Sequence, residues 1–253
     1  MKKETKFVAI SNQKGGVGKS AFTVLLASYL HYTKGKNVLV VDCDYPQHSI
    51  KAMRDRDKQV VEKNDFYKQM LVSQFSEINK KAYAILTSTP DEAKEAADLF
   101  LDKSEAEYDV VFFDLPGTVN AVGVFKSLIN MDFIFTPIIS DRMAMQSSLS
   151  FATTIQDFIK NRKDIPLQGL YLFWNMIDSR VSKELFNMYN EIMKRLKLQV
   201  LETVMPHTHR YNKELSISGK PFFRCTLFPP NSTVIQGSKL DNLSEEICQI
   251  IKL

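Results

Sequence analysis

Seven residues, Lys14 to Ser20, carry the clearest chemical signal in this 253-residue chain and spell KGGVGKS. The apolar run Phe7 to Ile10 precedes them, and a helix-like segment begins at Ser20. A strand, a glycine-rich turn and a helix in this order direct backbone N–H groups and a helix N-terminus at phosphate oxygens. Lys19 would reach the β- and γ-phosphates of a nucleotide, and the Ser20 hydroxyl would hold Mg²⁺.

A second lysine, Lys14, distinguishes this loop from the common pattern G-x-x-x-x-G-K-[ST]. That pattern has glycine where this chain has Gln13. An isolated extra lysine is most often a solvated surface charge, but this one lies inside the loop. We therefore predict that Lys14 acts on the phosphates.

An aspartate follows a buried strand at a second place in the chain. The run Val110 to Phe113 ends in Asp114, which is the Walker B arrangement. The carboxylate at this position orders the magnesium shell, usually through water. We predict this role for Asp114, although a strand-end aspartate can instead cap the next helix.

Two further aspartates, Asp42 and Asp44, follow the run Val38 to Val41. In an extended chain they would point to the same side, and a turn after Cys43 would let both face the phosphates. Asp44 is the best candidate to orient the attacking water, with Lys19, Mg²⁺ and Lys14 supplying positive charge. Helix capping remains the alternative for both. Together the loop and the carboxylates indicate nucleotide hydrolysis.

The elements that would position these residues alternate along the chain. Apolar runs without alternation suit strands buried on both faces, and helical patterns lie between them. We predict an α/β fold, a doubly wound and mostly parallel sheet with helices on both faces, which binds its ligand at the carboxyl ends of the strands. The predicted strands are 7–10, 38–41, 110–113, 133–139 and 169–174, and the predicted helices are 20–32, 143–160 and 183–196.

Three other segments give weaker predictions. A helix should begin at Thr89, with Thr89 as its cap and Glu92 completing a capping box. The polar segment 49–81 should be helical with an exposed face. The apolar stripe that includes Leu240, Leu243 and Ile247 should pack on the core as a C-terminal helix.

The composition of the chain limits the classes of protein to which it can belong. With 44% hydrophobic and 25% charged residues the chain should fold, and its length fits one domain over residues 1–253. The absence of a long apolar run and of a signal-like start predicts a cytoplasmic protein. Three cysteines without ligand spacing should be reduced thiols. The stretch 160–224 holds twelve Lys or Arg against six Asp or Glu, which suggests a polyanionic partner or simply a solvated surface.

These motifs together resemble the ParA/MinD superfamily of ATPases. KGGVGKS resembles its deviant Walker A loop, DCDYPQ its D-x-D-P-Q segment and FFDLPG its D-x-P-P segment. WNMIDSR and VMPHTHRYNKELSISGKPFF are similar to its C-terminal segments. The compact form looks most like ParA-like proteins carried on conjugative elements. Departures are Ala21 in place of a threonine, the inserted Tyr45, and Gly117 in place of a proline.

The resemblance implies an ATP-dependent sandwich dimer in which Lys14 reaches the partner's phosphates. It implies Asp44 as the catalytic aspartate and Ser20, Asp42 and Asp114 as the magnesium site. Adenine would lie near Asn175 and the backbone at Pro206, and Arg180 and Arg210 would bind DNA without sequence preference. The phosphate-binding residues would be Lys14, Gly15, Gly16, Val17, Gly18, Lys19, Ser20 and Ala21.

The implied function is a slow, partner-stimulated ATP hydrolase on the nucleoid that partitions or positions a plasmid or conjugative element. A ParB-like or conjugation-complex protein would stimulate it. Two alternatives remain: a nucleotide-gated scaffold or regulator of a conjugation complex, and a MinD-like membrane-cycling ATPase. Acidic residues Asp241, Glu245 and Glu246 on the C-terminal helix disfavour the membrane alternative.

Overall fold

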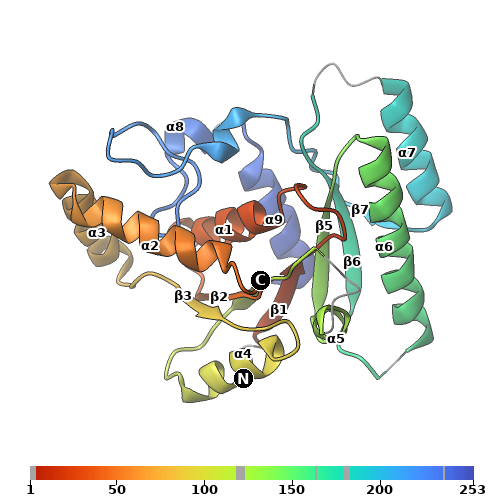
Figure 1. Ribbon diagram of the computed structural model, residues 1–253, viewed down its shortest axis with the longest axis horizontal. Coiled ribbons are helices and arrows are strands. Elements are labelled where there is room, and N and C mark those ends of the chain that lie inside the picture. Colours follow the sequence, from red (N-terminus) through yellow and green to blue (C-terminus); the bar gives the residue numbers. More distant parts are fainter. Residues whose placement is uncertain (1–3, 118–122, 163, 179–182, 236) are drawn as a thin grey trace.

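Parallel strands form one sheet in this computed structural model, which describes residues 4–117, 123–162, 164–178, 183–235 and 237–253. Within these residues the sheet has seven strands in the order β3-β2-β4-β1-β5-β6-β7 (Figure 1). The first strand, β1, lies between β4 and β5, so the loop that leaves its carboxyl end is central. The strands are β1 (Lys6–Ile10), β2 (Val38–Asp42), β3 (Ala84–Thr87), β4 (Val110–Asp114), β5 (Phe133–Ile138), β6 (Gly169–Trp174) and β7 (Gln199–Val200).

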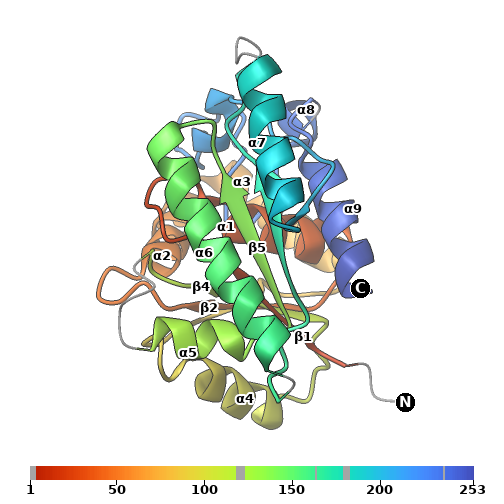
Figure 2. The same ribbon diagram turned by 90° about the vertical axis from the view of Figure 1, so that its right-hand side faces the viewer.

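Helices cover both faces of the sheet because successive strand residues point to opposite sides. In β1, Val8 and Ile10 belong to one buried cluster and Ala9 to the other. The two layers are visible in Figures 1 and 2. One layer contains α1 (Lys19–Ser28), its π-helical extension η1 (Tyr29–Thr33), α2 (Ser49–Glu62), α3 (Asp65–Ile78) and α9 (Leu240–Ile251). The other contains α4 (Ala93–Lys103), α5 (Val124–Ile129), α6 (Arg142–Asn161) and α7 (Lys183–Arg195).

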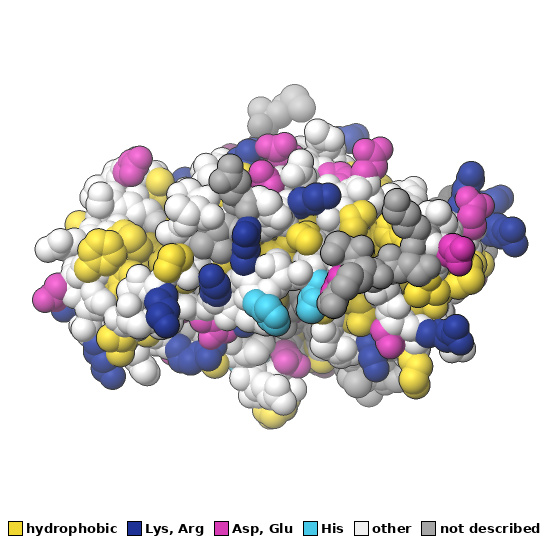
Figure 3. All heavy atoms as spheres, turned by 90° about the horizontal axis from the view of Figure 1, so that it is seen from above, with side chains coloured by type: hydrophobic (Ala, Val, Ile, Leu, Met, Phe, Trp, Pro, Cys, Tyr) yellow, Lys and Arg dark blue, Asp and Glu magenta, His cyan; other side chains and the backbone are white. Residues whose placement is uncertain are grey.

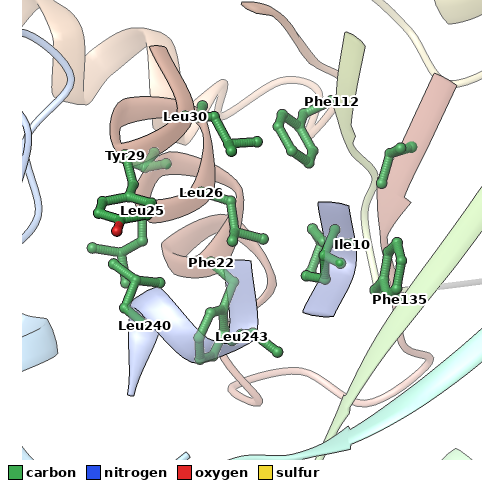
Figure 4. Packing of buried hydrophobic residues seen from close by; sticks show 14 of the residues in the cluster. Ile10, Phe22, Leu25, Leu26, Tyr29, Leu30, Phe112, Phe135, Leu240 and Leu243 are labelled. Carbon is green, nitrogen blue, oxygen red and sulfur yellow. The ribbon is translucent and has the colours of Figure 1, made fainter. Parts of the chain in front are cut away.

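Helix α1 packs against both the sheet and the C-terminal helix α9. Figure 4 shows side chains of α1, the sheet and α9 packed together, among them Phe22, Ile10 and Leu243. The Phe22 ring also meets the edge of Phe173 on β6, with centroids 5.0 Å apart. Four apolar residues of α9 are buried, and the prediction that this helix packs on the core is confirmed.

The predicted α/β fold is confirmed, and each of the five predicted strands is present within one residue at either end. The predictions omitted β3, α5, β7 and two short helices, η2 (His209–Asn212) and α8 (Ser232–Ile235). Strand β3 lies at the sheet edge and is only partly buried. The apolar run Ala82 to Leu86 was the signal available for it in the sequence. Segment 49–81 is helical as predicted, but the Asn64 side chain caps a second helix, α3, within it.

The predicted start of a helix at Thr89 is wrong. Helix α4 begins at Ala93, and the Thr89 hydroxyl contacts the Glu92 carboxylate in place of a backbone N–H. The intervening turn packs against α5, where the Ser127 hydroxyl donates to the Pro90 carbonyl. That tertiary contact keeps the turn out of the helix. No helix in the described ranges is both long enough and apolar enough to cross a bilayer.

Candidate nucleotide-binding site

The loop after β1 has the geometry of a phosphate cradle. Gly16 and Gly18 have positive φ angles of 77° and 96°, which disfavour residues with a side chain. At Gly15 and Gly16 a Cβ would meet no atom within 4 Å, so this stretch of the loop faces open space. Helix α1 begins directly after Gly18, which places its unpaired N–H groups at the loop. The loop therefore presents backbone donors to open space.

Two buried asparagines hold the loop in this shape. The Asn12 amide donates to the Pro137 carbonyl and the Ser148 hydroxyl, both at 2.8 Å, and its oxygen accepts the Lys14 N–H at 3.0 Å. The Asn175 amide donates to the Val17 carbonyl at 2.9 Å. Asn12 is not among the predicted site residues, although the polar pair Ser11 and Asn12 after a buried strand was the available signal.

Lys19 extends back across the loop. Its Nζ lies 3.4 Å from the Lys14 carbonyl. A Cβ on Gly117 would lie 3.0 Å from the same nitrogen, so the glycine leaves room for the ammonium group. Burial lowers the pKa of Lys19, and the Asp114 and Asp44 carboxylates oppose this by favouring its charged form. Lys19, Asp44 and Asp114 therefore share one electrostatic environment.

Asp114 is a buried carboxylate without a hydrogen bond. Neither of its oxygens has a hydrogen-bond partner among the described residues. Burial raises the pKa of Asp114 to about 7, and the Asp42 and Asp44 carboxylates add to the rise, whereas the nearby Ser20 hydroxyl and Lys19 ammonium group oppose it. An unpaired buried carboxylate is costly unless a cation balances it. Asp114 and the Ser20 hydroxyl therefore fit an oxygen-ligated cation such as Mg²⁺.

The described residues contain no group of three or more His, Cys, Asp or Glu side chains that could enclose a metal. This agrees with Mg²⁺, which is usually held by one or two carboxylates together with substrate phosphates. Neither His207 nor His209 gains a partner for a zinc site in the described structure, although their rings lie 5.9 Å apart.

Asp42 is engaged in a different way from Asp114. Its Oδ2 accepts the N–H groups of Ile50 and Lys51 at 2.9 Å, and its Oδ1 accepts that of Asp44 at 3.3 Å. Asp42 thus caps the first turn of α2, which was the alternative considered for strand-end aspartates. The predicted contact of Asp42 with magnesium would have to form in addition to these hydrogen bonds.

Asp44 lies on the turn after β2 and is half-buried. Its carboxylate favours the charged form of Lys19. The inserted Tyr45 is 64% exposed, and its ring meets that of His48 edge-on at 5.8 Å. Tyr45 therefore points away from the protein core.

The remaining residues predicted to bind nucleotide lie in two places, around the loop and the start of α1 and beside the end of β6. Lys14 is exposed, Val17 is buried, and Ser20 and Ala21 are half-buried at the start of α1. Pro206 forms a bridge with Ile177 beside the end of β6. Asn175 is fully buried and uses its oxygen on the Met176 N–H, so its amide braces the loop in this structure.

The structure describes one of the two arginines that were predicted to bind DNA. Arg210 is exposed on the turn η2 (His209–Asn212), beside the exposed residues His209 and Lys213 in the chain. Arg180 lies outside the described residues. Figure 3 shows lysine or arginine side chains close to the histidines at the centre of one face.

Comparison with known proteins agrees with this geometry. The chain is 27% identical over 244 residues to the sporulation initiation inhibitor protein Soj of Bacillus subtilis, covering 90% of this chain and 92% of Soj. A putative plasmid partition protein of Borrelia burgdorferi, solved with AMPPNP, shares its fold with a TM-score of 0.63 at 19% identity. That match covers 97% of this chain and 99% of the other.

The structure of pNOB8 ParA bound to nonspecific DNA has a TM-score of 0.58 at 18% identity, over 98% of this chain and 99% of that chain. The AAA_31 family model, described as an AAA domain, matches residues 5–168. This chain belongs to the AAA_31 family, the ParA, Soj and MinD group of P-loop ATPases.

Proposed function

We propose that this chain is a ParA-type ATPase that binds ATP and Mg²⁺, forms a nucleotide-sandwich dimer and hydrolyses ATP slowly on DNA. Residues 1–253 act as one ATPase domain. The observation that carries the proposal is the pairing of an open phosphate loop with the buried, unpaired Asp114 carboxylate at its side. A site with both features suits a phosphate-bound cation.

The site residues divide the work of phosphoryl transfer. Lys19 and the loop N–H groups bind the phosphates, and Ser20 and Asp114 would hold Mg²⁺, which neutralises phosphate charge when bound. Asp44 orients the attacking water. Lys14 is exposed at the rim of the loop, so its ammonium group is available to the phosphates of a second subunit. The Asn12 and Asn175 amides keep the loop in its binding shape.

DNA binding rests on the exposed basic stretch around Arg210 and on the likeness to a ParA solved with nonspecific DNA. Contacts from such a stretch go to phosphates and carry no sequence preference. The ATPase would thus act in the cytoplasm on the nucleoid, where it positions a plasmid or conjugative element. A ParB-like or conjugation-complex protein stimulates it.

The C-terminal helix argues against a membrane-cycling function. Its apolar residues Leu240, Leu243, Ile247 and Ile251 are buried against the core. A lipid-binding helix would have to expose these side chains. Only its polar side, which carries Asp241, Glu245 and Glu246, faces outward.

ATP turnover with and without nonspecific DNA tests the proposal. Asp44→Ala should lower turnover by about a hundredfold while ATP binding persists, because only the positioning of water is lost. Asp102→Ala, which changes an exposed aspartate on α4, serves as the matched control. Undiminished turnover in Asp44→Ala would contradict the catalytic role. ATP binding without any turnover, with DNA present, would favour the nucleotide-gated scaffold.

A further inference from the structure

An open groove runs along the edge of the sheet at β3, away from the nucleotide site. Its volume is about 880 Å³. Three of the four β3 residues, Ala84, Ile85 and Leu86, line it, and α2 and α3 supply much of the remaining wall. Because β3 is the last strand on this side, the groove borders a sheet edge.

The backbone of β3 has a free side along this groove. Strand β3 pairs with β2 in parallel register from Ala84 to Thr87. Among the described residues, no other group forms a hydrogen bond with the backbone of residues 84–87. Directly before the strand, side chains do contact the backbone. Arg54 donates to the Tyr83 carbonyl at 3.0 Å, and a ring nitrogen of His31 lies 2.9 Å from the Lys81 carbonyl. The open edge is therefore confined to β3 itself.

The floor of the groove is apolar and its rim is positively charged. The apolar side chains of Leu71, Phe75 and Phe100 are only partly buried there. Lys51, Lys58 and Lys81 stand on the rim against one carboxylate, Glu62. Lys51 pairs with Asp55 at 2.7 Å, whereas Lys58 and Lys81 form no ion pair with any described residue. Neither exposed lysine is held in an ion pair with a described residue, although the Asp55 carboxylate interacts electrostatically with Lys58. The lining of the groove therefore carries more positive than negative side chains.

We propose that this groove binds an extended segment of a partner protein, in which acidic and apolar residues alternate, as an additional strand on β3. Main-chain hydrogen bonds to a sheet edge provide affinity in this mode of recognition, and pockets for alternate side chains provide specificity. Apolar side chains of the segment contact the floor formed by Leu71, Phe75 and Phe100. Its acidic side chains face Lys58 and Lys81.

The charge of the rim selects this occupant over a second copy of the chain. Two β3 edges brought together would place the lysines of one copy against those of the other, and lysines at an edge strand oppose such self-pairing. The opposite edge of the sheet, β7, has two residues and offers a shorter template. The groove at β3 is therefore the better strand acceptor.

A labelled peptide in which valine and glutamate alternate serves as the probe, with binding followed by fluorescence anisotropy. Lys58→Glu with Lys81→Glu should weaken binding at least about tenfold, because both countercharges become repulsive. Lys103→Glu with Lys252→Glu changes two exposed lysines elsewhere and should leave binding unchanged. A peptide with alternate backbone nitrogens methylated should not bind, since it lacks the donors for strand pairing.

Amide hydrogen exchange locates the contact. The peptide should slow exchange within residues 84–87 and leave β7 unaffected. Equal affinity for the Lys58→Glu, Lys81→Glu protein, equal binding of the methylated peptide, or no binding at about 1 mM peptide would each overturn the proposal. Edge-to-edge dimers of the protein in place of peptide binding would also overturn it. ATP binding by the doubly substituted protein, measured in parallel, reports separately on the nucleotide site.

Discussion

Asp42 and Asp114 occupy paired positions at the ends of neighbouring strands β2 and β4, yet among the described residues the Asp42 carboxylate has hydrogen-bond partners and the Asp114 carboxylate has none. The Cys43 N–H donates to the Asp114 carbonyl at 2.9 Å, which keeps the two strand ends together. Asp42 satisfies the first turn of α2, whereas Asp114 is left for a cation. Two aspartates that look equivalent in the sequence thus have different chemistry.

The metal-free protein should become less stable as the pH rises from about 4 to 7. Asp114 has a folded pKa of about 7, above the usual value near 3.9, so the folded state holds a proton that the unfolded chain has released. Asp114→Asn should flatten this slope and raise the free energy of unfolding at pH 8 by about 2 to 4 kcal/mol. Urea unfolding across this pH range measures it.

The control for this prediction is Asp102→Asn, which should keep the slope of the parent protein. With Mg²⁺ and ATP present the order should reverse, because asparagine provides no charge to balance the cation. A pH slope in Asp114→Asn equal to that of the parent would show that Asp114 is ionised in the folded state.

Lys14→Ala should prevent ATP-dependent dimerisation while ATP binding to the monomer weakens only a few fold. The side chain is exposed, and the hydrogen bonds of Lys14 with Asn12 and Lys19 use its backbone, so the substitution leaves the loop intact. Light scattering with a non-hydrolysable ATP analogue measures the dimer. Lys103→Ala is the control, and a Lys14→Ala protein that dimerises normally would refute the cross-subunit role.

Arg210→Glu should weaken binding to nonspecific DNA and lower the slope of log K against log salt by about one unit. Arg210 is exposed among other basic side chains on its turn, so a phosphate contact would be lost. Filter binding over a range of salt concentrations measures this slope. Lys103→Glu, on the other face of the sheet, should have little effect. Equal slopes in parent and Arg210→Glu would remove Arg210 from the DNA-binding surface.

Gly117→Ala should reduce ATP affinity about tenfold and change stability little. The new Cβ would lie 3.0 Å from Lys19 Nζ, and the flexible lysine would move away before the backbone does. Because Gly117 does not have a positive φ angle, alanine fits its backbone. Calorimetric titration with ATP and thermal unfolding check the two parts. Unchanged affinity would mean that Lys19 does not depend on this space.

Arg54→Ala should cost about 3 kcal/mol of stability because it leaves Asp57 buried without its positive neighbour. Arg54 Nε donates to the Thr226 hydroxyl at 2.9 Å, and that hydroxyl donates to Asp57 at 2.6 Å. Thr226→Val should cost less, about 1 to 2 kcal/mol. Urea unfolding compares both with Lys58→Ala, which lies on the same helix and is exposed. Losses no larger than that of Lys58→Ala would show that the network adds no stability.

Local patterns in the sequence were sufficient for five strands of the sheet and for the phosphate loop. The run Val110 to Phe113 and the four other predicted strands are apolar without alternation. This pattern is typical of a strand that is covered on both faces, and each run forms a strand of the sheet. KGGVGKS specifies its loop because glycines are needed where the backbone turns with positive φ. These signals lie within short segments, so they could be read without knowledge of the fold.

Contacts between distant segments decided the rest. Strand β3, the open groove beside it and the late start of α4 depend on which elements pack next to them. The different surroundings of Asp42 and Asp114 arise because α2 presents its N–H groups to one carboxylate and not to the other. The bracing of the loop by Asn175 joins residues 158 positions apart. The sequence determined which residues could do the chemistry. Tertiary packing decided which of their oxygens remain free to do it, because burial and hydrogen bonding depend on neighbours that the local sequence does not specify.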